Sequence, residues 1–347
     1  MNCFKKFITI FFSNFLILII LICLAEIVFG YWFKKNNFGI HMRAERNKVA
    51  KINVSHHNGK KINFIYRRNF YGFIGEDFKP EDVKIVFEGG STGAEMWKPE
   101  ETSIVGVLNS LLKENNRDKK IYNASINGKS IRGYTYDFNH WFKKIPNFKP
   151  EYVIFYLGIN DRWFPDDEIH RFYDEQHSTE TLKKIRDYIK NNSFILEKVK
   201  KIKNKYFMKN YFLYDMNRKD LYNNFKYVNY KEAVKIHSLQ LDNDDKEYLF
   251  LLNQRLKNLN IVIKKSSFMP IFITQVKFNG LAERRMFLVN EEIKKFAKKN
   301  NYKVIPLDEL IEEMSIGDFF DEFHTTITGS EKIANKIFKN LNNYLLN

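Results

Sequence analysis

The chain has 347 residues, 44% of them hydrophobic, and a formal net charge of +16 at pH 7. A chain of this length holds one large domain or two smaller ones, and its apolar content excludes a disordered protein. The two cysteines, Cys3 and Cys23, both lie in or beside an N-terminal apolar segment. The remainder of the chain therefore has neither a disulfide nor a cysteine-based metal site.

The positive charge has two interpretations. Lysines on solvated faces of a chain rich in Lys, Asn, Ile and Phe can reflect a nucleotide-composition bias alone. Alternatively, the charge attracts an anionic glycan or anionic lipid headgroups. No run of consecutive basic residues exceeds a few positions, which favours the first interpretation. No nucleic-acid-binding motif accompanies the charge, so we expect no nucleic-acid partner.

The apolar segment spans residues 7–30 and has two lysines on either side. At about 1.5 Å per residue, a helix of this length crosses a hydrocarbon layer of about 30 Å. We therefore predict a membrane-spanning signal anchor, with residues 1–33 forming a cytoplasmic tail and the span. A cleaved signal peptide is the alternative, but its apolar part is usually only about 7–15 residues long.

Residues 34–81 are polar and irregular and are interpreted as a stalk leading into an edge hairpin. From residue 82 onward, apolar runs of strand length alternate with segments of helical periodicity. Strands are expected over residues 84–88, 120–124, 151–157, 268–274 and 303–306. Helices are expected over residues 104–112, 134–143, 248–263 and 289–299, and at the C-terminus. This alternation indicates a parallel sheet covered on both faces. We predict a flavodoxin-like three-layer α/β/α sandwich with a five-stranded parallel sheet, formed by residues 82–347.

The pattern breaks over residues 162–245, which are rich in Tyr, Lys and Asn. Helical pieces occur over residues 181–188 and 194–202, and no run of the sheet type is evident. We therefore expect a helical insertion. It has several aromatic residues: Tyr206, Phe207, Tyr211, Phe212 and Tyr214. They either stack on sugar rings at the rim of the active site or form the insertion's own small core.

Four short blocks of polar residues and glycine each follow a predicted strand. They contain Ser91 after Gly89-Gly90, Gly128, Asn160 after Gly158, and the pair formed by Asp321 and His324. In an open parallel sheet, ligands bind outside the carboxyl ends of the strands, so the blocks converge on one edge. Together they supply a nucleophile, oxyanion donors and an acid/base pair, as an acyl-transfer enzyme requires.

These blocks resemble those of the SGNH hydrolases, a branch of the GDSL esterases. The resemblance covers residues 82–162 and 268–347, together with the lead-in at residues 69–73. The family's Gly-Asp-Ser reads Gly-Gly-Ser here, as it does in many members that act on surface polysaccharides.

The resemblance implies a role for each residue. Ser91 would be the nucleophile, His324 the general base and Asp321 the residue that orients it. Gly128, Asn160 and the backbone N–H of Ser91 would form the oxyanion hole. Each residue also has a structural alternative: Ser91 as a helix cap, and Gly128 and Asn160 as turn residues.

Three further residues close to the blocks are candidates for substrate binding: Trp97, Arg132 and Arg162. Their alternative roles are packing and surface charge. His56 and His57 are interpreted as a solvated loop pair, so we expect no metal site. The chemistry requires no cofactor.

The resulting hypothesis is a membrane-anchored esterase that removes O-acyl groups, most simply O-acetyl groups, from a cell-envelope or surface polysaccharide. An O-acetyltransferase of the same glycan class and a catalytically silent glycan-binding protein are the alternatives. Basic residues after the apolar segment outnumber those before it, but long downstream domains translocate largely regardless of such charge. The resemblance therefore favours an extracytoplasmic catalytic domain. Sequence leaves open whether the protein has protein partners.

Overall fold

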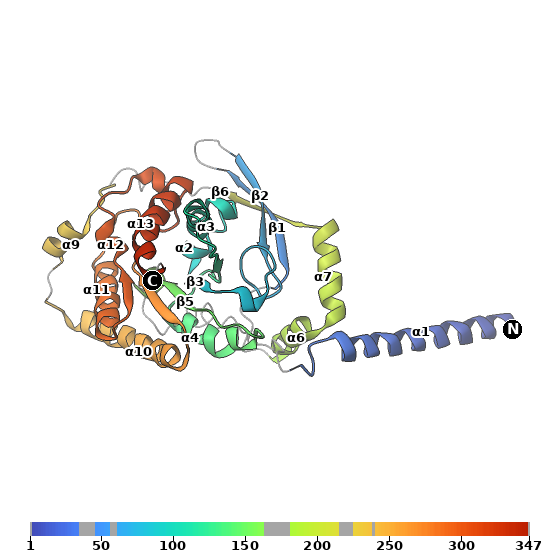
Figure 1. Cartoon of the computed structure of the whole chain (residues 1–347). Helices are drawn as coiled ribbons and strands as arrows, with labels where there is room; N and C mark the ends of the chain where they lie inside the picture. The colour runs from blue at the N-terminus through green and yellow to red at the C-terminus, as the bar shows by residue number, and fades with distance from the viewer. Residues whose placement is uncertain are drawn as a thin grey trace.

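The structure is a computed structural model that describes residues 2–34, 46–55, 61–162, 181–214, 225–237 and 240–345. Its centre is a five-stranded sheet with the strand order β4-β3-β5-β7-β8 (Figure 1). The strands are β3 (Ile85–Gly89), β4 (Ile121–Asn123), β5 (Tyr152–Tyr156), β7 (Met269–Ile273) and β8 (Lys303–Ile305). Every pairing between neighbours is parallel.

Helices cover both faces of this sheet and bury it in two apolar cores. On one face, α3 (Ile104–Glu114) and α13 (Ile327–Leu345) pack with side chains such as Leu108 and Ile337. On the other face lie α4 (Ile131–His140), α10 (Asn243–Lys265) and α11 (Arg284–Lys299). Strands buried on both faces need continuous apolar runs, and β3 is buried along its whole length. The predicted three-layer sandwich is confirmed.

Short elements connect these layers. They are η1 (Pro80–Asp82), α2 (Ser91–Ala94), η2 (Glu100–Thr102), η3 (Phe142–Lys144), η4 (Ile159–Arg162), α9 (Tyr230–Ile236), α12 (Leu307–Leu310) and η5 (Ile316–Asp318). Two of them, α2 and η4, follow directly on the carboxyl ends of strands β3 and β5. They therefore place their side chains at the edge of the sheet where the polar blocks converge.

A second sheet of three strands lies beside the first. Its hairpin pairs β1 (Lys48–Ser55) with β2 (Lys61–Arg68) antiparallel, and β6 (Lys209–Tyr214) joins β1 in parallel. Ile74 forms bridges to both Arg68 and Asn123, which connects the hairpin to the edge strand β4.

The expected helical insertion needs a correction. It contains α6 (Thr181–Asn192) and α7 (Phe194–Tyr206), as predicted, but also the strand β6. No strand was expected there because β6 pairs with β1, more than 150 residues earlier, and such pairing leaves no local signal. Tyr211 packs against the core of this second sheet, whereas Phe212 is exposed. The boundaries of the insertion stay a prediction.

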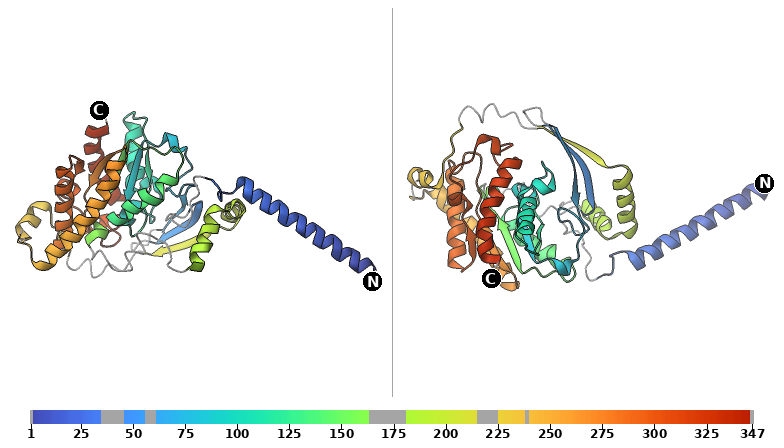
Figure 2. Two further views of the ribbon diagram at one scale, coloured as in Figure 1. Left: turned by 90° about the horizontal axis from the view of Figure 1, so that it is seen from below. Right: turned by 45° about the horizontal axis from the view of Figure 1, so that its top comes forward.

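The helix α1 (Asn2–Phe29) extends away from the rest of the molecule (Figures 1 and 2). Within residues 4–29, the most apolar window of 18 residues has a mean hydropathy of 2.8, and this window is not buried against any part of the described chain. Among the described residues, this is the one helix long and apolar enough to cross a membrane. A signal sequence has the same properties. The pair α6 and α7 lies between α1 and the three-layer sandwich (Figure 2).

Candidate active site

The structure brings the nucleophile candidate and the acid/base pair together in a hydrogen-bonded chain. Ser91 begins α2 directly after β3, and His324 lies in the loop between η5 and α13. His324 Nε2 is 2.8 Å from Ser91 Oγ, and His324 Nδ1 is 2.6 Å from Asp321 Oδ2. Both distances lie in the range of hydrogen bonds. This is the geometry that a Ser-His-Asp triad requires.

Asp321 is fixed by its own loop. Its second carboxylate oxygen, Oδ1, accepts hydrogen bonds of 2.8 Å from the backbone N–H groups of Phe323 and His324. Burial by itself raises the pKa of Asp321, but the hydrogen bond and charge of His324, with the two backbone donors, outweigh it and lower that pKa. Asp321 is therefore ionised at neutral pH and held in one orientation toward the imidazole.

The turn that presents Ser91 depends on glycine at position 90. A Cβ atom on Gly90 would lie 2.4 Å from Asn160 Nδ2 and 3.3 Å from the carbonyl oxygen of Lys129. Only glycine therefore lets the Asn160 amide approach the Ser91 turn this closely. Asn160 Nδ2 donates one hydrogen bond of 2.9 Å to the Lys129 carbonyl. An amide has two N–H groups, so a second donor of Asn160 is left over among the described contacts.

Gly128 lies in the turn after β4 with a φ angle of 75°. This left-handed conformation favours glycine over residues with a side chain. Within the described part of the chain, no acceptor is present for the backbone N–H of Gly128 or of Ser91. Both N–H groups can therefore donate to a ligand, together with the second N–H of Asn160.

A buried ion-pair cluster supports the Gly128 turn from below. Lys129 Nζ lies 2.6 Å from Glu88 Oε2 on β3 and 2.5 Å from Asp137 Oδ2 on α4. All three side chains are buried. The residue next to Gly128 is thus fixed both to the strand that leads to Ser91 and to the following helix.

A second buried cluster supports the Asn160 turn. Asp161 accepts a hydrogen bond of 3.0 Å from the backbone N–H of Ile131, at the start of α4, and pairs with Arg255 at 3.2 Å. Gln275, just after β7, accepts from the N–H of Ile159 at 2.8 Å and donates to Thr92 Oγ1 at 2.9 Å. These contacts hold the Asn160 turn against α4 and the end of β7.

The Ser91 and His324 loops are connected by a third cluster. Lys98 Nζ forms an ion pair of 2.6 Å with Glu95 Oε1, at the end of α2. It also donates to the carbonyl oxygen of Thr325, the residue after His324, and to Ser330 Oγ on α13. Burial lowers the pKa of Lys98, and the Glu95 carboxylate opposes that shift.

The three candidates for substrate binding have different environments. The indole of Trp97 lies against the His324 ring, with centroids 4.1 Å apart. Arg162 is buried, stacks over Phe323 at 4.1 Å and lies 3.5 Å from a carboxylate oxygen of Glu283. Arg132 is half-buried in the first turn of α4 and makes no hydrogen bond or ion pair to the triad residues within the described chain. Of the three, Trp97 alone touches a triad side chain among the described contacts.

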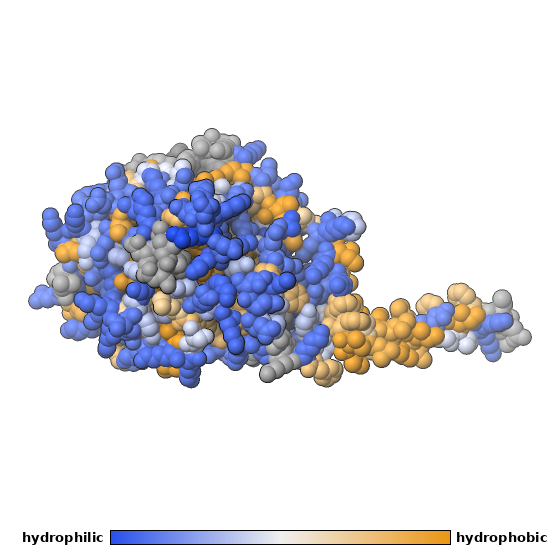
Figure 3. Space-filling model, in the orientation of Figure 1, coloured by the Kyte–Doolittle hydropathy of each residue, from blue (hydrophilic) through white to orange (hydrophobic). Residues whose placement is uncertain are grey.

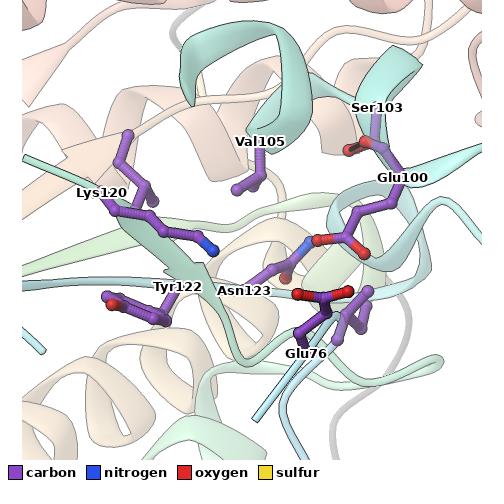
Figure 4. A pocket seen from close by; sticks show the side chains of 9 residues that line it. Glu76, Glu100, Ser103, Val105, Lys120, Tyr122 and Asn123 are labelled. Carbon is purple, nitrogen blue, oxygen red and sulfur yellow. Dashed lines mark hydrogen bonds between the residues drawn. The ribbon is translucent and has the colours of Figure 1, made fainter. Parts of the chain in front are cut away.

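The described cavities lie apart from the triad. The one in Figure 4 has a volume of about 10 Å³, room for a single water molecule, and Glu76 and Glu100 point toward one another across it. Burial raises the pKa of Glu100. Larger cavities of about 530 and 620 Å³ lie beside α7 and beside α11, and no triad residue lines either of them.

No cluster of potential metal ligands occurs among the described residues. His56 and His57 lie outside the described residues, so their interpretation as a loop pair stays a prediction. The side chain of Tyr214 also lies outside the described part of the chain, so its proposed role stays a prediction.

A parallel α/β sandwich with a Ser-His-Asp chain at the carboxyl edge is the arrangement of a serine hydrolase. The sequence model described as GDSL-like Lipase/Acylhydrolase matches residues 85–337. The chain therefore belongs to this family and is an ester hydrolase. No curated protein matches the sequence.

Several solved structures are similar to this chain at low identity. TesA is 13% identical, with a TM-score of 0.41, and the match covers 75% of this chain and 98% of TesA. An acetyl xylan esterase from Geobacillus stearothermophilus is 15% identical, with a TM-score of 0.43 and coverage of 75% and 94%. The psychrotrophic esterase EstA from Pseudoalteromonas is 12% identical, with a TM-score of 0.40 and coverage of 76% and 99%.

Proposed function

We propose that this protein is a serine esterase that removes O-acyl groups, most simply acetyl groups, from a cell-envelope or surface polysaccharide. The observation that carries the proposal is the hydrogen-bonded chain from Ser91 Oγ through His324 to Asp321. It lies beside N–H donors of Gly128 and Asn160 at one edge of the sheet.

The reaction proceeds in two steps. The Nδ1–H of His324 donates to Asp321, which leaves Nε2 to take the Ser91 proton as Oγ attacks the ester carbonyl. The oxyanion of the tetrahedral intermediate accepts hydrogen bonds from the backbone N–H groups of Ser91 and Gly128 and from the Asn160 amide. His324 returns the proton to the leaving sugar hydroxyl, and an acyl group stays on Ser91. Water, activated by His324 in the same way, then releases the carboxylic acid.

Two features support a carbohydrate ester as substrate. The Gly-Gly-Ser form of the nucleophile block resembles that of family members acting on surface polysaccharides. The second is the net charge of +16, which under its second interpretation attracts an anionic polymer. Transfer of the acyl group from Ser91 to a sugar hydroxyl is the second candidate, because it uses the same acyl-enzyme. The intact set of Ser, His, Asp, Gly and Asn argues against a silent glycan-binding protein.

We further infer that α1 anchors the protein and that the catalytic domain lies outside the cytoplasm. The apolar length of α1 and its separation from the sandwich support an anchor. A reporter active only outside the cytoplasm, fused after Asn347, tests the orientation. If that reporter is inactive and a reporter that works only in the cytoplasm is active at the same position, the orientation is the opposite one and surface glycans are excluded as substrates.

One experiment separates the catalytic candidates. The full chain in detergent is given an activated acetyl ester, with and without an added glycan, and free acetate and acetylated sugar are measured. Acetate release that depends on Ser91 supports the esterase, and acetyl transfer to the glycan supports the transferase. If neither product exceeds the level measured with Ser91→Ala, the catalytically silent glycan-binding protein is the remaining candidate.

A further inference from the structure

We propose that α6 and α7 form a membrane-surface element that lies on the headgroups of an anionic bilayer and sets the height of the catalytic domain above it. This inference rests on the proposed anchor, because α1 would bring the bilayer to these helices. Four observations carry it: an inverted amphipathic pattern, a fixed connection to the end of α1, the direction of α7 and a positive charge.

The helix α7 presents its polar side to the protein and its apolar side outward. On the inner side, Lys200 Nζ donates to the Arg46 carbonyl at 2.5 Å, and Asn204 donates to the Asn47 carbonyl at 2.6 Å. On the outer side, Val199, Ile202 and Tyr206 recur at helical spacing, and each is more than half exposed. A surface helix of a soluble protein has the opposite arrangement. The outer stripe therefore needs an apolar environment that the described part of the chain does not supply.

The helix α6 repeats the pattern. Leu182, Ile185 and Ile189 are spaced three and four residues apart, so they form one stripe, and all three are exposed. Tyr188, beside this stripe, is partly buried and contacts Trp32, with ring centroids 5.8 Å apart. Two consecutive helices thus leave apolar stripes uncovered on the side of the body from which α1 extends (Figure 1).

The end of α1 is attached to the start of α7 by a carboxylate. Glu26 accepts hydrogen bonds from Ser193 Oγ at 2.5 Å and from the backbone N–H groups of Phe194 at 3.1 Å and Ile195 at 3.0 Å. It also accepts one of 2.7 Å from Trp32 Nε1. A charged side chain belongs at the boundary of the hydrocarbon and not inside it. The contact of Glu26 with the N-terminus of α7 therefore places that helix at the same boundary.

The direction of α7 agrees with a surface position. It runs across the direction of α1 and not along it (Figures 1 and 2). If α1 crosses the bilayer, α7 lies along the bilayer surface. In the space-filling view, apolar surface continues from α1 onto this side of the body (Figure 3). Aromatic residues typical of the membrane interface, Tyr31 and Trp32, occur at the junction.

The charge of both helices suits anionic headgroups. The helix α6 has four basic residues and one acidic residue, and α7 has five basic residues and one acidic residue. Lys198 and Lys203 lie on either side of the apolar stripe of α7 and are exposed. Interfacial helices combine an apolar stripe with flanking lysines in this way, and each lysine near an anionic surface adds to the attraction. Anionic phospholipid is therefore the partner that fits both the apolar stripe and its flanks.

The test measures whether the outer stripe enters lipid. The only cysteines, Cys3 and Cys23, are replaced by serine, and single cysteines are introduced by Val199→Cys or Ile202→Cys. An environment-sensitive fluorophore is attached, and the full chain is placed in bilayers with and without phosphatidylglycerol. Phe250→Cys on α10 is the matched control, because Phe250 is an equally exposed apolar residue far from α1.

We expect the emission at positions 199 and 202 to shift to shorter wavelength in anionic bilayers, and most of it to be quenched by lipids with nitroxide-labelled chains. The control at position 250 stays at the aqueous wavelength. Lys198→Gln combined with Lys203→Gln weakens the dependence on phosphatidylglycerol. An unshifted and unquenched signal at both α7 positions overturns the proposal, and so does a shift produced by soluble glycan in place of lipid.

A chain with Cys23 as its only labelled cysteine separates this outcome from failure of the anchor. Cys23 lies within α1 and is exposed there. Quenching at Cys23 without quenching at Val199→Cys shows that the anchor inserts and that the surface element does not exist. Absence of quenching at both sites overturns the anchor and the surface element together.

Discussion

Replacement of Lys98 by methionine tests whether a buried ion pair holds the two halves of the triad together. Lys98 pairs with Glu95, which ends the helix begun by Ser91, and it donates to the carbonyl of Thr325, next to His324. Methionine has a similar length but no charge and no N–H donor. The variant Lys98→Met therefore leaves the Glu95 carboxylate buried without its cation.

The expected loss follows from the burial of both partners. Removing one partner of a buried ion pair costs about 3–5 kcal/mol, because the other charge is left without compensation. In a domain of this size each kcal/mol lowers Tm by about 2–4 °C, so the loss amounts to roughly 6–20 °C. We also expect a lower kcat on a small acetyl ester, because the segment after His324 loses its anchor.

The matched control is Lys84→Met. Lys84 pairs with Glu151 at 3.1 Å, but both side chains are 49% exposed, and such a pair contributes only about 0–1 kcal/mol. Thermal unfolding followed by circular dichroism measures both variants. The double variant Glu95→Gln with Lys98→Met should recover much of the lost stability, because no charge is left buried. A Tm of Lys98→Met equal to that of the control, or a double variant no more stable than the single one, would refute the reasoning.

Three further predictions concern the triad and the oxyanion hole. Ser91→Ala and His324→Ala each nearly abolish turnover of an acetyl ester, and the double variant is little worse than either, since the effects of residues that act as one catalytic unit are not additive. Steady-state rates of the three variants test this, and additive losses would show that the two residues do not act as one unit. Asn160→Ala lowers kcat by about 10²–10³ with a smaller change in KM, as expected for loss of one oxyanion donor, and an unchanged kcat would exclude that role. Because the pKa of Asp321 is lower in the folded protein than the ordinary 3.8 of the unfolded chain, its ionised carboxylate stabilises the fold above that pH, and this stabilisation is lost as the pH falls through the folded pKa. Denaturant titrations should therefore show that the difference in unfolding free energy between wild type and Asp321→Asn shrinks in this acidic range. A difference that stays constant with pH would contradict the lowered pKa.

The main sheet could be predicted from the sequence because its strands are buried on both faces. The ends of each observed strand of this sheet agree with the expected ends to within one or two residues. The strand β5, for example, covers residues 152–156, and residues 151–157 were expected. The strand β6 was missed because the apolar residue Phe212 on its exposed side removes the alternation of polar and apolar residues in the sequence, and because its partner is distant in the chain. Local sequence patterns predict an element whose own residues show which of its faces is buried, and the residues of β6 do not show this.

The relative placement of the catalytic blocks was predictable for a different reason. Each block follows a strand, and parallel strands end at the same edge, so Ser91 and His324 were expected to meet although 233 residues separate them. The contact of Trp97 with His324 could only be suggested, because sequence separation after the nucleophile does not determine where an indole points. Gln275, which connects the Ser91 and Asn160 turns, was not recognised at all.

The buried charges were missed because isolated lysines and glutamates in a highly charged chain are normally solvated. Glu88 stands in an apolar strand and Lys129 follows a turn glycine, yet they pair below the active site at 2.6 Å. The three buried clusters have a common arrangement: each connects one catalytic turn to a neighbouring turn or helix. Apolar pairs of similar volume often stabilise a protein as well or better than buried ion pairs. Because these clusters lie under the Ser91, Gly128 and Asn160 turns, we infer that the buried charges fix the relative positions of these turns and do not mainly stabilise the fold.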